Sequence, residues 1–227
     1  MARAAGRSVS DDPRLLFLIR HGRSDFESTD TVETARGRQW DPPLGREGRE
    51  QAELLGRRLA LMPAPSAVYC STFRRARETV APYAAQTGCD VTYLEELAEA
   101  FIGAWEGMSF EEIMRDDAEM LHLFRNQEAM WRRAPGAEQL PALQERAISA
   151  IESILERHPD GNVVVVAHGG IINAYIAPIL GLHDREMFFL PDNTSINTVV
   201  VEGDRRSVRF LSDVRHLNEP HFFEADD

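Results

Sequence analysis

The sequence predicts an α/β fold: a three-layer α/β/α sandwich with a mainly parallel sheet and an antiparallel edge strand. Short apolar runs alternate along the chain with longer segments of helical periodicity, which is typical of βα units around a parallel sheet. Near the C-terminus, two strand-like segments flank a Glu-Gly-Asp-Arg turn, which indicates a hairpin and therefore an antiparallel edge.

The first predicted strand is residues 15–19, an uninterrupted apolar run of the kind found in strands buried on both faces. A polar loop is expected to follow as far as Leu44. Residues 45–62 then predict a helix, because their apolar side chains recur along one stripe.

A second strand is predicted at residues 67–70, followed by a helix from about residue 73 to residue 88. Ser71 or Thr72 is expected to cap that helix, because either side chain can accept a hydrogen bond from its first N–H groups. Residues 91–97 predict the third strand.

The last third of the chain contains the clearest strand signal. Residues 163–166 are a run of four valines, which predicts a fully buried strand between helices at residues 140–158 and 171–180. The predicted hairpin consists of residues 196–201 and 207–211. Together these elements complete the three layers.

The chain of 227 residues is expected to form one domain. We place that domain at residues 14–218, with a helical cap inserted at about residues 104–139 over the mouth of a pocket. Residues 1–13 and the acidic residues 219–227 are expected to be disordered tails, because neither contains an apolar core.

Composition excludes several classes of function. The net charge of -12 argues against nucleic acids as partners, because binding to their backbone needs a broad basic surface. No apolar run reaches membrane-spanning length, and the N-terminus lacks a signal peptide. Cys70 and Cys89 are too few for a disulfide framework or a zinc site. We therefore expect a cytoplasmic protein without a metal or a membrane partner, either a monomer or a homodimer.

All 25 basic residues are arginine. Without lysine, a Walker-type phosphate loop, a pyridoxal Schiff base and a lysine nucleophile are excluded. Arginine instead suits forked, bidentate recognition of phosphate or carboxylate. The places where arginines gather in this acidic chain are therefore informative.

Polar side chains follow the ends of four predicted strands, where ligands bind in open α/β sheets. These side chains are Arg20, His21, Arg74, Arg75, Arg77, Glu99 and His168. Such groups suit phosphoryl transfer: a neutral imidazole can attack phosphorus, guanidinium groups meet the charge on its oxygens, and a carboxylic acid can protonate the leaving oxygen.

Five segments carry a resemblance to a known family. Residues 18–24 (LIRHGRS) resemble the arginine-histidine-glycine signature of the histidine phosphatase, or phosphoglycerate mutase-like, superfamily. Residues 41–51, 70–79, 97–107 and 167–170 are similar to further motifs of that family, in the family's order. One such match is weak evidence, whereas several in order are strong evidence.

The resemblance implies a phosphoglycerate mutase-like fold and a set of roles. It implies that His21 is phosphorylated, that Arg20 and Arg75 hold the phosphate, and that His168 stabilises the transferring group. It also implies that Glu99 is the proton donor and, in hydrolysis, the base. The implied enzyme is a phosphomonoester hydrolase of the histidine acid phosphatase type, which needs no cofactor and acts on a small phosphorylated metabolite or a phosphopeptide.

We assign substrate binding to six residues, two of which, Arg20 and Arg75, also hold the phosphate. The six are Arg20, Arg23, Ser24, Glu27, Arg75 and Gly169. Arg23 and Glu27 stand where many family members carry Glu or Gln and Asn, which reverses the charge near the nucleophile. We hypothesise that Glu27 disfavours small phosphates that carry a carboxylate, such as phosphoglycerate.

Two other functions stay open. A mutase would return the phosphoryl group to the bound substrate, but the short segment before His168 and the glycine at Gly170 resemble phosphatases of the family. A phosphate-binding module without catalysis is disfavoured because every residue needed for the reaction is present. Glu95, Glu96 and Glu106 lie close to Glu99, and a solvated acidic surface is the ordinary meaning of such a cluster.

Overall fold

The computed structural model describes residues 13–108, 112–113, 115, 133–185 and 187–217. They form a six-stranded sheet with the strand order β5-β4-β6-β1-β7-β8. The strands are β1 (Arg14–Arg20), β4 (Ala67–Ser71), β5 (Val91–Leu94), β6 (Val163–Ala167), β7 (Ile196–Glu202) and β8 (Arg205–Asp213). The first four are parallel to one another, and β7 and β8 are antiparallel additions. The predicted sheet and its antiparallel edge are confirmed.

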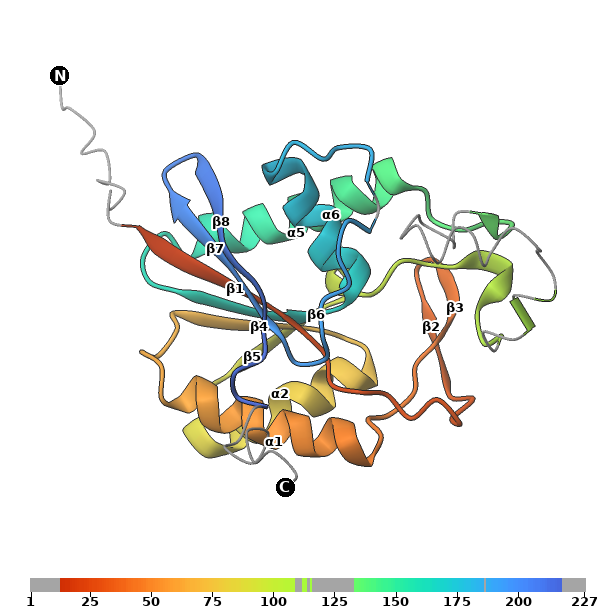
Figure 1. The fold of residues 1–227 in the computed structure, drawn as a ribbon, viewed down its shortest axis with the longest axis horizontal. Helices are drawn as coiled ribbons and strands as arrows, with labels where there is room; N and C mark the ends of the chain where they lie inside the picture. Colours follow the sequence, from red (N-terminus) through yellow and green to blue (C-terminus); the bar gives the residue numbers. More distant parts are fainter. Residues whose placement is uncertain (1–12, 109–111, 114, 116–132, 186, 218–227) are drawn as a thin grey trace, which may run out of the picture.

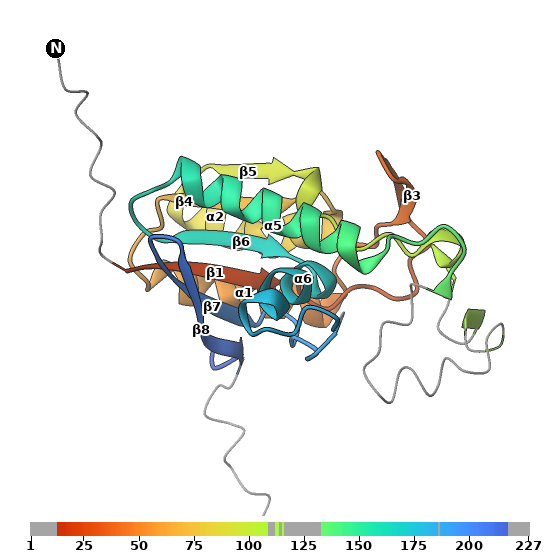
Figure 2. The same cartoon turned by 90° about the horizontal axis from the view of Figure 1, so that it is seen from above.

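Helices cover both faces of this sheet, as Figures 1 and 2 show. The helices are α1 (Arg46–Ala60), α2 (Arg74–Thr87), α5 (Leu140–Arg157) and α6 (Gly169–Ile179). Side chains of α1 and α2 share one apolar cluster with the sheet, and those of α5 and α6 share another on the opposite face. This arrangement is the predicted three-layer sandwich.

The alternation of side chains along β1 explains why its sequence is apolar throughout. Leu16 and Leu18 belong to the cluster with α5 and α6, whereas Phe17 and Ile19 belong to the cluster with α1 and α2. Successive side chains of a strand point to opposite faces, so a strand with helices on both sides needs apolar residues at every position. β6 is buried along its whole length for the same reason.

The third predicted strand is too long. β5 ends at Leu94, and Glu95–Leu97 forms a single 3-10 turn, η1. β5 lies at the edge of the sheet and pairs only with β4, whose last paired residue is Ser71. Beyond that residue no neighbouring strand continues the ladder, so the chain turns away.

The loop predicted before Leu44 contains a hairpin. β2 (Thr31–Thr34) and β3 (Gly37–Trp40) pair antiparallel and form a separate two-stranded sheet. Gly37 has a φ of 123°, a conformation that favours glycine at this turn. The strands are too short and too polar for their alternation to stand out in the sequence.

The predicted domain boundaries stay predictions. The predicted tails, residues 1–13 and 219–227, lie outside the described residues apart from Pro13, as does most of the helical cap predicted at about residues 104–139. The two ends of the inserted segment are described and lie together: Trp105 packs with Ala134 and Ala137. Within the described ranges, every helix is too short or too polar to cross a membrane.

Candidate active site

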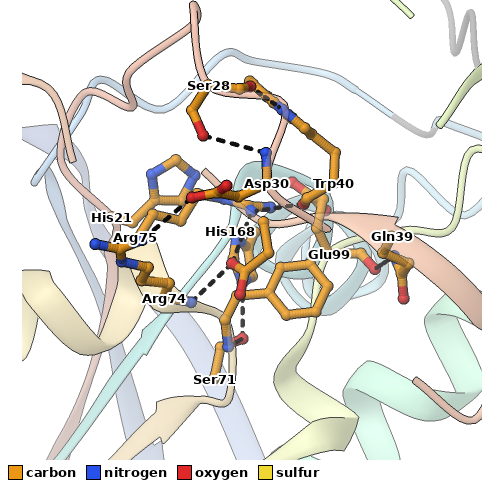
Figure 3. Close-up of polar contacts among 12 residues, drawn as sticks. His21, Ser28, Asp30, Gln39, Trp40, Ser71, Arg74, Arg75, Glu99 and His168 are labelled. Atoms are coloured by element: carbon orange, nitrogen blue, oxygen red, sulfur yellow. Dashed lines mark hydrogen bonds and ion pairs between the residues drawn. The ribbon is translucent and has the colours of Figure 1, made fainter. Parts of the chain in front are cut away.

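Four adjacent strands, in the order β5-β4-β6-β1, bring the predicted residues together at the carboxyl ends of the parallel strands. β6 lies between β4 and β1, and the backbone N–H of His21 donates to the carbonyl of Ala167, 3.0 Å away. The imidazole rings of His21 and His168 therefore lie side by side, with centroids 5.1 Å apart (Figure 3). His21 and His168 are 147 positions apart in the chain. They meet because the neighbouring parallel strands β1 and β6 end on the same side of the sheet.

A pocket of about 200 Å³ opens at this edge. Its lining residues are Arg20, His21, Ser24, Phe26, Gln39, Trp40, Phe73, Arg75, Glu99, Ala100, Ile102, Glu106 and Asn193. The predicted nucleophile, both predicted phosphate-holding arginines and the predicted proton donor thus share one small cavity.

The hydrogen bonds of His21 define which of its ring nitrogens is free. Nδ1 lies 2.8 Å from the carbonyl oxygen of Gly22, which can only accept, so Nδ1 carries the hydrogen. Nε2 then keeps its lone pair for a nucleophilic attack. The Gly22 N–H donates to Oγ1 of Thr79 at 2.9 Å, which holds the peptide unit that orients the ring.

His168 is fully buried, and its Nε2 lies 2.8 Å from Oγ of Ser71. This oxygen already accepts a hydrogen bond from the Phe73 N–H at 3.3 Å. Within the described residues the Ser71 hydroxyl has no acceptor other than His168, so we infer that it donates to Nε2 and that Nδ1 of His168 carries the hydrogen. Nδ1 is a buried donor without a partner in the described ranges, suited to a phosphoryl oxygen.

Arg75 is held on all sides in the pocket. Its Nη1 donates to the carbonyl of Trp40 at 3.1 Å, and Asp41 lies 3.6 Å away. The guanidinium also lies over the Phe73 ring, 4.7 Å from its centroid. Burial lowers the pKa of Arg75 to about 10, so the group stays charged at neutral pH.

Arg20 is the second cation in the pocket. Its Nη1 donates to the carbonyl of Pro191 at 2.5 Å. Its Nε is buried and has no partner among the residues described. A buried N–H without a partner costs free energy, about 1–3 kcal/mol, which an anion would recover on binding. Arg74, by contrast, pairs with Asp30 and Glu78 and does not belong to the pocket lining.

Glu99 lies against the first turn of α6. The Gly170 N–H is 3.1 Å from its Oε1, and the Ala100 N–H donates to the same oxygen at 2.9 Å. A Cβ at Gly170 would stand 2.3 Å from Oε1 of Glu99, so any other residue there would displace the carboxylate. The glycine seen in the sequence therefore makes room for the proposed acid.

Both histidines are neutral in this site. Burial in the protein interior lowers the pKa of His21 well below its ordinary value, and the positive charges of Arg75 and Arg20 lower it further. The pKa of His168 is also well below its usual range, for the same leading reason and through the same arginines. A neutral imidazole is the form that can attack phosphorus.

We expect the pH titration of His21 to have its midpoint below the ordinary value of about 6.5. Because the folded protein disfavours the imidazolium, the ring stays neutral and nucleophilic as pH falls through that value. NMR titration of the free protein, with His21→Asn to assign the signal, measures the midpoint. A midpoint at or above about 6.5 contradicts the prediction.

The predicted substrate-binding residues separate into two groups. Ser24 is buried and lines the pocket with Arg20 and Arg75. Arg23 is exposed and lies 3.4 Å from Glu47, outside the lining.

Glu27 and Gly169 complete the predicted set. Glu27 is exposed, and neither residue belongs to the lining. Their roles, and the charge hypothesis for Glu27, stay predictions.

Sequence reasoning missed several residues of the site. They are Phe26, Gln39, Trp40, Ser71, Glu106 and Asn193. Ser71 or Thr72 was expected to cap the following helix, but the N-cap of α2 is Phe73 and no side chain caps the helix. Ser71 accepts a hydrogen bond from the Phe73 N–H and bonds His168.

Asn193 holds the nucleophile loop through a bond from its Nδ2 to the carbonyl of His21, 3.0 Å away. Its signal in the sequence, a Pro-Asp-Asn-Thr turn before a strand, indicates a turn and not a site.

A family model described as the histidine phosphatase superfamily (branch 1) matches residues 16–214 of this chain. Among curated proteins, a metal-independent phosphoserine phosphatase of Arabidopsis thaliana is 26% identical over 217 residues, covering 95% of this chain and 88% of that protein. A phosphoglycerate mutase-like protein 4 of the same plant is 27% identical, covering 92% and 90%. A glucosyl-3-phosphoglycerate phosphatase of Mycobacterium tuberculosis is 32% identical over 180 residues, covering 74% and 76%.

Among solved structures, YhfR of Bacillus stearothermophilus has the same fold. It is 28% identical, with a TM-score of 0.77, and the match covers 90% of this chain and 100% of that one.

Proposed function

Because the chain belongs to the histidine phosphatase superfamily, we propose that it hydrolyses phosphomonoesters through a phosphohistidine on His21. One observation carries this proposal: Nε2 of His21 has a free lone pair in a pocket that also holds the buried guanidinium of Arg75 and the partly buried guanidinium of Arg20. A nucleophile beside fixed positive charge is the arrangement that phosphoryl transfer needs.

In the first step, Nε2 of His21 attacks phosphorus and the bond from phosphorus to the ester oxygen breaks. Glu99 gives its proton to that oxygen, so the alcohol leaves in neutral form. In the second step, the Glu99 carboxylate takes a proton from water, whose oxygen attacks the phosphorus. The bond to His21 breaks, and inorganic phosphate leaves.

Arg20, Arg75 and His168 stabilise the charge that spreads over the phosphoryl oxygens in both steps. The Nε of Arg20 and Nδ1 of His168 are buried donors without partners in the described residues, so they need no rearrangement to bind an anion. None of these steps requires a metal or a cofactor.

The proposal extends to the type of phosphatase, its substrate and its location. We propose the hydrolase activity of a histidine acid phosphatase, because a neutral His21 would remain nucleophilic in mildly acidic solution. We propose a small phosphorylated metabolite or phosphopeptide as substrate and the cytoplasm as location. The free thiols of Cys70 and Cys89 support a reducing compartment.

A screen of sugar phosphates, nucleotides and phosphopeptides tests the proposal. We expect at least one ester to release phosphate and alcohol in equal amounts, with an acid-labile phosphoenzyme trapped during turnover. A parallel assay with 3-phosphoglycerate and bisphosphoglycerate tests the mutase alternative. Isomerisation without phosphate release would replace the hydrolase by a mutase, and a folded protein without any turnover would leave only phosphate binding.

A further inference from the structure

The pocket lining combines two kinds of side chain. Arg20 and Arg75 are the cations in the described lining, and both are assigned to the phosphoryl group. The apolar members are Phe26, Trp40, Phe73, Ala100 and Ile102. These apolar side chains are therefore available to contact the leaving group of the ester.

Phe26 is unusual among these side chains because 69% of its surface is exposed. Isolated exposed apolar residues are normal on protein surfaces. Phe26, however, lines the pocket and stacks on Trp40, with ring centroids 6.0 Å apart and 28° between the planes. It presents a wide aromatic face at the site, to which a second ring can add.

Trp40 is rigidly held and connects this aromatic pair to the reacting centre. Its indole N–H donates to the carbonyl of Ser28 at 2.7 Å, and its backbone N–H donates to Oε2 of Glu106 at 2.9 Å. Its carbonyl accepts a hydrogen bond from Arg75. The distance between Trp40 and the phosphate-holding Arg75 is therefore set by the protein before substrate binds.

We propose that Phe26 and Trp40 form an aromatic subsite for the leaving group, which selects phosphate esters of alcohols that carry an aromatic ring next to the ester oxygen. The inference rests on the proposed function and names its substrate class. Covering Phe26 with a ring removes apolar surface from water and adds a stacking contact. Because Trp40 is already held in place, ordering this half of the pair costs little entropy when substrate binds.

Benzyl phosphate and ethyl phosphate provide the test, because their alkoxide leaving groups are of similar basicity and only one carries a ring. We expect the wild-type protein to have the higher kcat/KM for benzyl phosphate. Phe26→Ala should lower that value roughly tenfold and leave ethyl phosphate within about twofold. Phe26→Tyr, which keeps the ring, should retain the preference.

Leu61→Ala is the matched control, because Leu61 is 89% exposed at the end of α1 and lies outside the pocket lining. It should change neither ester. Equal rates of the two esters in the wild type, or equal losses in Phe26→Ala, would overturn the subsite.

Binding of benzylphosphonate, measured by calorimetry, separates this inference from the proposed function. This compound cannot be hydrolysed at its carbon–phosphorus bond, so its affinity does not depend on turnover. If benzylphosphonate binds more tightly than ethylphosphonate, and Phe26→Ala removes this difference in affinity, the result supports the subsite even in a protein without activity. Equal affinity for the two phosphonates refutes it even in an active one.

Discussion

Replacement of His21 by alanine is expected to lower kcat for phosphate esters by roughly 10⁴-fold or more, because it removes the atom that bonds to phosphorus. His21 is the only histidine that lines the described pocket. The neighbouring His168 is fully buried outside that lining, its Nε2 is hydrogen-bonded to Ser71, and we infer that its Nδ1 carries a hydrogen. No acid-labile phosphoenzyme should be trapped from this variant. Steady-state kinetics and quenched-flow labelling measure the two losses.

His183→Ala is the control for this variant, because His183 is exposed and lies outside the pocket. The His21→Ala protein should still bind inorganic phosphate, since Arg20 and Arg75 remain, and phosphate should still raise its Tm. Retention of more than about a tenth of the wild-type kcat would show that the phosphoryl group is accepted elsewhere.

Replacement of Glu99 by glutamine is expected to lower phosphoenzyme formation from benzyl phosphate by roughly 10²–10⁴-fold. Glutamine cannot give a proton to a poor leaving group such as an alkoxide. Formation of the phosphoenzyme from p-nitrophenyl phosphate should fall much less, because its leaving group needs no proton. Rapid-quench measurement of this first step with the two esters isolates the proton donor.

Glu96→Gln and Glu106→Gln are the matched comparisons for Glu99. Glu96 is exposed outside the pocket, so its loss should have no effect on either ester. Glu106 lines the pocket, but its two oxygens accept hydrogen bonds from the Trp40 and Ile102 N–H groups, so we assign it to holding the backbone. A larger, leaving-group-dependent loss in Glu106→Gln would transfer the role of acid to Glu106.

Gly170→Ala is a second variant that should impair proton donation by Glu99, because it moves the carboxylate without replacing it. The added Cβ would stand 2.3 Å from Oε1 of Glu99 and move that group away from the leaving oxygen. The variant should therefore show the same dependence on leaving group, with a smaller magnitude. This geometry gives a physical reason for a glycine at position 170.

Strand ends were the part of the site that the sequence predicted best. Arg20, His21 and His168 follow runs of apolar residues that can only be buried strands, and a parallel sheet brings such ends together. The choice of Arg75 among the arginines after the second strand rests on the family resemblance. In the structure Arg75 is buried in the pocket, and Arg74 pairs with Asp30 and Glu78 outside it.

Local pattern was a poor guide to residues that act through long-range contacts. Ser71 ends a strand and precedes a helix, so its sequence context indicates a cap, whereas its side chain bonds His168 at the N-terminus of α6, 97 positions away. Trp40 and Phe26 lie in a polar stretch with no periodicity to report. Their position beside Arg75 depends on the β2–β3 hairpin and on where it packs.

The sequence alone determined the fold class, the alternation of strands and helices and the set of reactive groups, because hydrophobic periodicity records which faces are buried and residue type records which chemistry is available. Only the tertiary structure decided which strands are neighbours, which nitrogen of His21 is free and which aromatic side chains line the pocket. Those features depend on partners far away in the chain, and no local pattern specifies a partner.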